Sequence, residues 1–203
     1  MITIIDYKAG NIRSIQNMLR KLGYECQISD NFKIIEMADK IILPGVGSFD
    51  HGVEQLKQLG LWQLLIKKAH NKIPFLGICL GAQLMGTGSE EGDKEGLGLF
   101  DMHNIRFEIN KLNKHHKIPH MGWGNIDLLK DSKIISNQTE DHRYYFVHSY
   151  HFTTNDESII SAMCRYSYNF PCALEKDNIF ALQFHPEKSH KYGMDILRKF
   201  ADL

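Results

Sequence analysis

Short apolar runs alternate with longer amphipathic stretches in the first half of the chain. Four of the runs have the length of strands: residues 2–5, 25–29, 40–43 and 73–78. Apolar residues recur at helical spacing in the stretches between them, at residues 12–22 and 52–70. Asn11 is placed to cap the first of these helices, and Gly23 is placed to end it. The alternation of strand and helix predicts a mostly parallel, doubly wound sheet with helices on both faces.

In the second half, strands follow one another without long helical segments between them. Strands or strand pairs are predicted at residues 105–108, 143–152, 158–164, 171–175 and 179–184. Asp177 and Asn178 form a hairpin turn between the last two of these strands. Tyr192, Ile196 and Phe200 stand at helical spacing and predict a closing helix. The sequence therefore predicts an α/β fold with an antiparallel β extension, in a single domain that covers residues 1–203.

Composition narrows the class of protein. The 203 residues are 43% hydrophobic, which suits one globular domain. Lysine plus arginine and aspartate plus glutamate each total 24, so neither a nucleic-acid nor a membrane partner is indicated. No apolar run approaches the ~20 residues that span a bilayer. The four cysteines form no CxxC pair, and no basic region precedes a long apolar core near Met1, so we expect a cytoplasmic location.

A tight turn between a buried strand and a helix carries the first candidate for chemistry. Gly77 and Gly81 flank Cys79 in the spacing Gly-x-Cys-x-Gly, which reproduces a nucleophile elbow with sulfur in place of a serine oxygen. Because the helix is expected to start at the cysteine, its unpaired amides and its dipole favour the reactive thiolate. The alternative is a buried cysteine that serves as a small hydrophobic residue, as most cysteines do. The two glycines, which let strand and helix approach closely, favour the nucleophile.

A cysteine nucleophile needs a base within hydrogen-bond reach and a third group that orients the base. His185 and Glu187 supply both, and Pro186 stiffens the turn between them. They follow the strand predicted at residues 179–184, and the carboxyl end of a parallel strand is where an α/β fold places its active site. No cysteine or carboxylate accompanies a histidine at metal-ligand spacing, so neither a metal ion nor a cofactor is predicted.

The cysteine and histidine segments resemble those of a known family. Residues 77–81 and 184–187 are similar to the triad signature of the class I glutamine amidotransferases, which hydrolyse glutamine to glutamate and ammonia through a cysteine thioester. The resemblance implies the glutaminase fold of that family. It also implies that Cys79 attacks the glutamine carboxamide, that His185 transfers protons, and that Glu187 orients His185.

The same resemblance implies an oxyanion hole made of backbone amides. The amide of Leu80 is one donor, and the other comes from the glycine-rich turn after the third strand, where Val46 and Gly47 are the candidates. The bare amides of such a turn can face an anion. The alternative is a flexible loop, because a single glycine-rich turn is a weak signal.

Four residues are implied to hold the glutamine: Gln83, Glu91, Ser149 and Tyr150, the last two through their backbone. Glu90 competes with Glu91 for the acidic position. Gln83 lies one helical turn after the nucleophile, so its side chain is expected to point back over the helix start towards the site. The alternative is an ordinary polar position on an amphipathic helix.

A narrower resemblance is to the glutaminase subunits of imidazole glycerol phosphate synthases. It rests on motifs along the whole chain, at residues 5–7, 10–11, 43–49, 119–123, 147–150 and 184–189. Ammonia released into neutral water would become ammonium, so a partner that receives it through a water-poor passage is expected. The resemblance implies a heterodimer with a (β/α)₈ cyclase that makes imidazole glycerol phosphate and an aminoimidazole carboxamide ribotide in histidine biosynthesis. Asn11, Trp123 and Lys188 are implied to lie near the shared face.

One departure from these subunits leaves other partners open. Gly124 stands directly after Trp123, where the subunits usually have asparagine, and Asn125 follows it. The first alternative is a related glutaminase subunit that serves a surface-polysaccharide sugar amidotransferase. A catalytically silent interaction subunit is an alternative from another class, which the intact triad disfavours. A stress protein with a cysteine elbow is a third, and it would leave the His-Pro-Glu segment unexplained.

Overall fold

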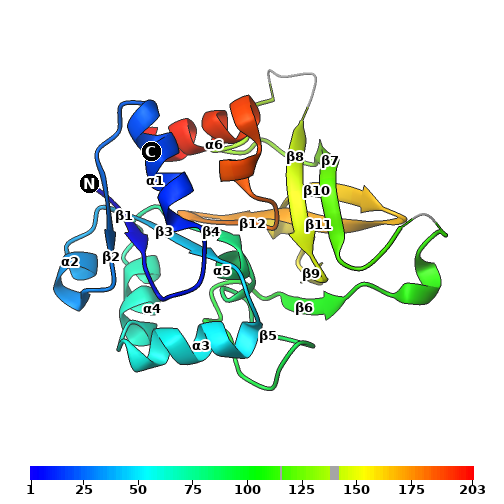
Figure 1. Ribbon diagram of the computed structural model, residues 1–203, viewed down its shortest axis with the longest axis horizontal. Helices are drawn as coiled ribbons and strands as arrows, with labels where there is room; N and C mark the ends of the chain where they lie inside the picture. Colours follow the sequence, from blue (N-terminus) through cyan, green and yellow to red (C-terminus); the bar gives the residue numbers. More distant parts are fainter. Residues whose placement is uncertain (115, 138–141) are drawn as a thin grey trace.

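One large mixed sheet organises the molecule. The computed structural model describes residues 1–114, 116–137 and 142–203. Within them, nine strands form a sheet in the order β2-β1-β3-β4-β12-β11-β10-β7-β8, and three form a second sheet in the order β5-β6-β9 (Figure 1). The large sheet is parallel from β2 to β12 and antiparallel from there to β8. The predicted parallel sheet with an antiparallel extension is therefore confirmed.

The parallel strands form the buried centre of the fold. They are β1 (Ile2–Ile5), β2 (Cys26–Ser29), β3 (Lys40–Gly45), β4 (Phe75–Cys79) and β12 (Ile179–Leu182). Strands β1, β4 and β12 are buried along their whole length, as expected for strands that are covered on both faces. Because β12 lies beside β4, the two segments that carry the candidate triad leave the sheet side by side.

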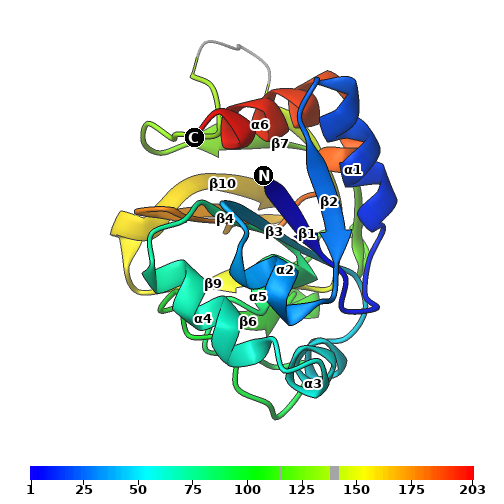
Figure 2. The ribbon, with the colours of Figure 1, turned by 90° about the vertical axis from the view of Figure 1, so that its left-hand side faces the viewer.

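Helices cover both faces of this part of the sheet, as Figure 2 shows. On one face α1 (Ile12–Lys21) packs against α6 (His190–Asp202), and on the other lie α2 (Phe32–Glu36), α3 (Phe49–Gln58) and α4 (Trp62–His70). Each face has its own apolar cluster, with Leu19 and Leu197 in one and Val53 and Leu64 in the other. None of the described helices is long and apolar enough to cross a membrane.

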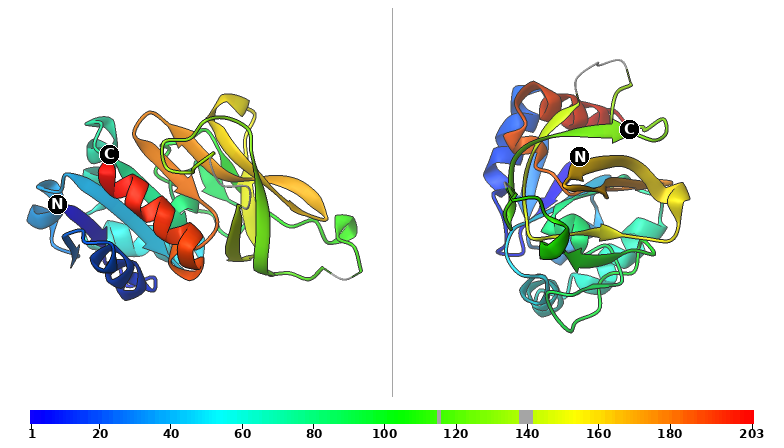
Figure 3. Two further views of the ribbon diagram at one scale, coloured as in Figure 1. Left: turned by 90° about the horizontal axis from the view of Figure 1, so that it is seen from above. Right: turned by 90° about the vertical axis from the view of Figure 1, so that its right-hand side faces the viewer.

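The antiparallel part lies beside the helical part in the view from above (Figure 3). Its strands are β11 (Tyr168–Lys176), β10 (Ile160–Tyr166), β7 (His120–Leu128) and β8 (Arg143–His148). The small sheet consists of β5 (Gly88–Ser89), β6 (His103–Arg106) and β9 (Tyr150–Thr153). Three short 3₁₀ helices complete the described elements: η1 (Ile109–Lys111), η2 (Glu157–Ile159) and η3 (Pro186–Lys188).

The ends of the first helices follow local chemistry. Gly23 has φ +89 and ends α1 as predicted, and the amide of Tyr24 donates to the carbonyl of Leu19, which makes the helix end a Schellman motif. Asn11 is the residue before α1, but its side chain makes no capping hydrogen bond. The single helix predicted over residues 52–70 is wrong. Gly60, with φ +68, closes a second Schellman motif there and separates α3 from α4.

The structure adds detail to two further predictions about local structure. The helix after Cys79 is a single turn, α5 (Leu80–Gln83), because the chain turns out of it at Gly86, where a Cβ would lie 2.5 Å from the carbonyl oxygen of Met102. Residues 143–152, predicted as a strand or a strand pair, form two strands, and these belong to different sheets. Strand β8 ends at His148 and β9 starts at Tyr150, so Ser149 lies at the bend between them.

Candidate active site

Cys79 occupies a strained elbow between β4 and α5. Its backbone angles are φ 54° and ψ −112°, a conformation that residues other than glycine rarely adopt. A Cβ on Gly77 would lie 2.7 Å from the Cα of Ala82, and one on Gly81 would lie 1.8 Å from the carbonyl oxygen of Leu43. The flanking glycines are therefore required by close backbone packing, and the structure has the elbow that the spacing predicts.

His185 and Glu187 form a buried pair next to this elbow. His185 Nδ1 lies 2.8 Å from Glu187 Oε1, and the two side chains are 2% and 4% exposed. The His185 backbone amide donates to the carbonyl of Tyr145 at 2.9 Å, which fixes the turn that follows β12. Among the described atoms, none forms a hydrogen bond with His185 Nε2. This nitrogen is therefore available to exchange a proton with sulfur or substrate.

The charge balance favours a protonated His185. Burial lowers the pKa of its imidazole, but the Cys79 sulfur and the Glu187 carboxylate raise it by more. The net effect brings the pKa of His185 to about 10. The structure thus brings together the three residues for which the sequence predicts a triad, in the arrangement of nucleophile, base and orienting carboxylate.

A cavity of about 410 Å³ opens in front of Cys79. Its walls come from the loop after β3, the elbow, and the ends of β8 and β9. They are formed by Val46, Gly47, Cys79, Leu80, Gln83, Glu91, Pro119, Val147, His148, Ser149, Tyr150 and Lys188. All the predicted oxyanion-hole and glutamine-binding residues are therefore in one cavity. Of the residues predicted to lie near the partner, Lys188 lines it, whereas Asn11 and Trp123 do not.

The structure separates the two neighbouring glutamates. Glu91 lines the cavity, and its Oε2 accepts a hydrogen bond of 2.8 Å from the amide of Phe49 at the start of α3. Glu90 is exposed, and its Oε2 accepts one of 2.7 Å from the amide of Arg106. Only Glu91 is therefore placed to meet a ligand in front of Cys79.

The loop after β3 combines an exposed tip with a crowded base. Val46 is 45% exposed, and Gly47 has φ +114 with open space where a Cβ would be. At the base, a Cβ on Gly45 would lie 2.0 Å from Tyr7 Oη and 3.0 Å from the amide nitrogen of Gly81. No role for Tyr7 is predicted from the sequence. Its fully buried hydroxyl has no hydrogen-bond partner among the described atoms. Burial is the main cause that raises the pKa of this hydroxyl, and the charge of Cys79 raises it further.

A chain of amide groups leads from the cavity wall to the nucleophile. Gln83 Nε2 donates to the carbonyl of Tyr150 and to Gln183 Oε1, both at 3.1 Å. Gln183 Nε2 in turn lies 3.8 Å from Cys79 Sγ. Gln83 points inward as predicted. Gln183 is not among the site residues predicted from the sequence, although its position two residues before His185 at the end of a strand places both side chains on the same side.

Two buried histidines support the same wall. His148 Nδ1 lies 2.7 Å from the carbonyl oxygen of Tyr150, and His148 Nε2 lies 3.1 Å from His120 Nδ1. Burial lowers the pKa of His120 to about 4 and lowers that of His148 as well, so both rings are neutral. The described residues contain no group of three potential metal ligands.

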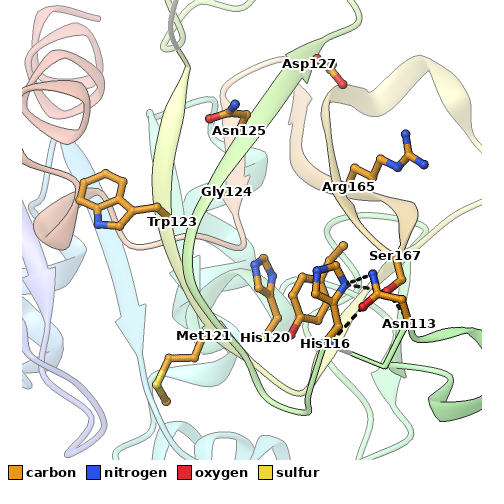
Figure 4. Close-up of a pocket in the computed structure, with 11 residues that line it drawn as sticks. Asn113, His116, His120, Met121, Trp123, Gly124, Asn125, Asp127, Arg165 and Ser167 are labelled. Atoms are coloured by element: carbon orange, nitrogen blue, oxygen red, sulfur yellow. Dashed lines mark hydrogen bonds between the residues drawn. The ribbon is translucent and has the colours of Figure 1, made fainter.

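Trp123 lies on the outer surface of β7, beside a second hollow of about 550 Å³ (Figure 4). It is 44% exposed and stacks on His190, and the neighbouring Met121 is 62% exposed. Lys188 lies over the ring of Tyr145, which is in edge contact with Trp123. Asn11 is exposed at the start of α1, which contacts η3. The three residues predicted to lie near the partner thus belong to adjoining elements.

The comparisons with known proteins cover the whole chain. The family model "Glutamine amidotransferase class-I" matches residues 3–202. The chain is 44% identical over 204 residues to imidazole glycerol phosphate synthase subunit HisH 2 of Pseudomonas aeruginosa, with 100% of both chains covered. It is 46% identical to HisH 2 of Methanococcus maripaludis, with 98% of each covered, and 41% identical to HisH 1 of that organism, with 100% of each covered. A crystal structure titled as a glutamine amidotransferase has the same fold, with a TM-score of 0.76, 16% identity and 100% coverage of both chains.

Proposed function

The chain belongs to the class I glutamine amidotransferases, and we propose that it is the glutaminase subunit of an imidazole glycerol phosphate synthase. The observation that carries this proposal is the buried Cys79–His185–Glu187 group at the cavity, in a chain that resembles HisH subunits over its whole length. It hydrolyses L-glutamine to glutamate and ammonia, and it works as one domain over residues 1–203 without a cofactor.

The reaction proceeds in two steps through a thioester. The Cys79 thiol first transfers its proton to His185. The resulting thiolate then attacks the side-chain carbonyl carbon of glutamine. The oxyanion that forms accepts hydrogen bonds from the amides of Leu80 and of Val46 or Gly47. His185 then donates its proton to the departing nitrogen, and ammonia leaves. In the second step His185 takes a proton from water, the resulting hydroxide attacks the thioester, and glutamate and the thiolate are released.

The substrate is held by groups on the opposite walls of the cavity. The Glu91 carboxylate suits the ammonium group of glutamine, and its hydrogen bond to the amide of Phe49 keeps it in one position. Gln83 and the backbone of Ser149 and Tyr150 face the same space and supply neutral donors and acceptors. These roles agree with a small polar substrate, which the balanced charge of the chain also favours.

The ammonia passes to a (β/α)₈ cyclase of the HisF type, with which the chain forms a heterodimer. Asn11, Trp123 and Lys188 are proposed to lie near the shared face. The exposed Met121 and Trp123 support this assignment, because an aromatic residue and a methionine that are exposed on the face of a sheet are typical of docking surfaces. We further propose that the complex works in the cytoplasm.

A comparison of two nitrogen sources tests this function. The chain is combined with the cyclase from the same organism, and synthesis is followed with glutamine or with an ammonium salt. Cys79→Ser is expected to abolish glutamine-dependent synthesis and to leave ammonium-dependent synthesis unchanged, because only ammonia release passes through the thiolate. If Cys79→Ser kept more than about a hundredth of the glutamine-dependent rate, the nucleophile assignment would be wrong.

A second candidate partner is a surface-polysaccharide sugar amidotransferase. Methanococcus maripaludis has two proteins with the HisH name, and this chain is more similar to HisH 2, at 46% identity, than to HisH 1, at 41%. An organism with two such subunits can use one of them for another ammonia acceptor. In addition, a Cβ on Gly124 would lie 3.0 Å from the ring of Phe146 and 3.1 Å from Cys164 Sγ, so asparagine does not fit there without repacking. Capture of the cyclase or of a sugar amidotransferase by the tagged chain decides between the two.

A further inference from the structure

Gln183 is a buried amide in contact with the nucleophile. It follows β12 directly, its backbone amide donates to the carbonyl of Cys172 at 2.9 Å, and its side chain is fully buried. Its Nε2 lies 3.8 Å from Cys79 Sγ, and its Oε1 lies 3.1 Å from Gln83 Nε2. A fully buried amide has to satisfy its polar atoms inside the protein, and here both of its ends do so within the site.

The orientation of the Gln183 amide follows from a backbone group. The carbonyl of Tyr150 can only accept hydrogen bonds, so the atom of Gln83 that lies 3.1 Å from it must be the NH₂ group. The same NH₂ group faces Gln183, which must therefore present its oxygen to Gln83. This leaves the NH₂ group of Gln183 facing sulfur. The Tyr150 carbonyl thus fixes a donor against Cys79 through two side chains.

A donor at this position has a chemical consequence. Helix α5 has only four residues, so the thiolate receives little from a helix dipole, contrary to what the sequence suggests. An N–H group directed at sulfur stabilises the anionic thiolate more than the neutral thioester, because hydrogen bonds to charged groups are stronger. The thiolate is both the nucleophile of the first step and the leaving group of the second.

We propose that Gln183 is a catalytic residue whose amide donates to the Cys79 thiolate and links it to Gln83. The inference rests on the proposed function, since it deepens the role of the same cysteine. It distinguishes Gln183 from a residue that only fills space beside the triad. A space-filling residue would affect the stability of the fold and leave the ionisation of Cys79 unchanged.

Alkylation of Cys79 by iodoacetamide measures the thiolate directly. The rate is followed against pH by mass spectrometry of the Cys79 peptide, on the full chain without glutamine or partner. Gln183→Met removes the donor, and Gln183→Glu replaces it with an anion. Each is expected to move the pH midpoint of alkylation upward by about one unit or more, which is about a tenfold loss of thiolate below the midpoint. Gln27→Glu makes the same exchange at a half-buried amide that donates to Thr3, and it is expected to leave the midpoint in place.

A measurement on the chain without substitutions covers the case in which both variants fail to fold. In the ¹⁵N-labelled protein, the side-chain NH₂ resonances of Gln183 are expected to shift when Cys79 is alkylated. Unchanged resonances, or unchanged midpoints in folded variants, would overturn the inference. The proposed function has a separate test. It would be wrong if the chain without substitutions, combined with its partner, released no glutamate even though the Gln183 variants shift the alkylation midpoint.

Discussion

Replacing Glu187 by glutamine removes the charge that we propose orients and supports the base His185, with little change in shape. Glu187 Oε1 lies 2.8 Å from His185 Nδ1, and the two side chains are 2% and 4% exposed, so solvent screens the pair only weakly. The neutral amide can still accept the Nδ1–H bond, but it no longer favours the imidazolium. The variant is therefore expected to fold and to change the pH dependence of the reaction.

The direction of this change follows from the charges around His185. The carboxylate is one of the groups that raise the pKa of His185 to about 10, so the unmodified enzyme keeps its imidazolium up to that pH. Without the carboxylate the pKa falls, and the alkaline limb of the pH–rate profile moves to lower pH. An opposite charge at this distance shifts the pKa of its partner by about one to three units. A shift of about two units brings the limb to about pH 8, and the rate at pH 9 then falls about tenfold.

Glutamate release by the complex with the partner, measured from pH 6 to 10.5, gives the profile. Glu175→Gln is the matched control, because Glu175 is also a buried carboxylate but binds Ser132 and Lys133 away from the site. Its alkaline limb is expected to stay in place. An unmoved limb in Glu187→Gln would refute the electrostatic role. A loss of rate as large as that of Cys79→Ala would mean that Glu187 takes part in the chemistry directly.

Three further outcomes are expected. Glu91→Gln should raise the KM for glutamine about tenfold or more in steady-state assays, whereas Glu90→Gln should change it less than twofold; equal effects would contradict the assignment of Glu91. Gly45→Ala should lower the free energy of unfolding in urea by about 1–3 kcal/mol because its Cβ would meet Tyr7 Oη at 2.0 Å, and addition of Tyr7→Phe should restore part of this loss. The isolated chain should release glutamate about a hundred- to a thousand-fold more slowly than the complex with partner and partner's substrate, because one missing oxyanion donor costs about that much in rate. Equal rates would rule out control of the oxyanion donor by the partner.

The sequence predicts the parallel half of the fold well because buried parallel strands leave continuous apolar runs. Strand β7 is not predicted, since two of its first five residues are glycine and its large apolar residues Met121 and Trp123 are exposed while His120 is buried. The break at Ser149 is hidden for the opposite reason. Apolar residues continue on both sides of it, and only the pairing of β8 and β9 with different sheets reveals the bend.

The site is predictable where its chemistry depends on neighbours in the sequence. Cys79 has its glycines beside it, and His185 has Glu187 two residues away, so the triad follows from spacing. Gln183 lies about a hundred positions after both Cys79 and Gln83 in the sequence, so no local pattern encodes its contacts with them. The choice between Glu90 and Glu91 likewise depends on which backbone amide each carboxylate meets.

The distribution of hydrogen bonds around the site indicates where partner control can act. Three bonds tie the His185 segment to β8 and to itself: the His185 amide to the Tyr145 carbonyl, the Tyr145 amide to Ser189 Oγ, and Ser189 Oγ to the His185 carbonyl. The base and its carboxylate are therefore held before any partner binds. The tip of the loop after β3 is different, because Val46 is 45% exposed and Gly47 has open space around it at φ +114. A peptide plane can rotate there at small steric cost, so we expect this loop, with the proposed oxyanion donor, to be the part of the site that a docked partner switches.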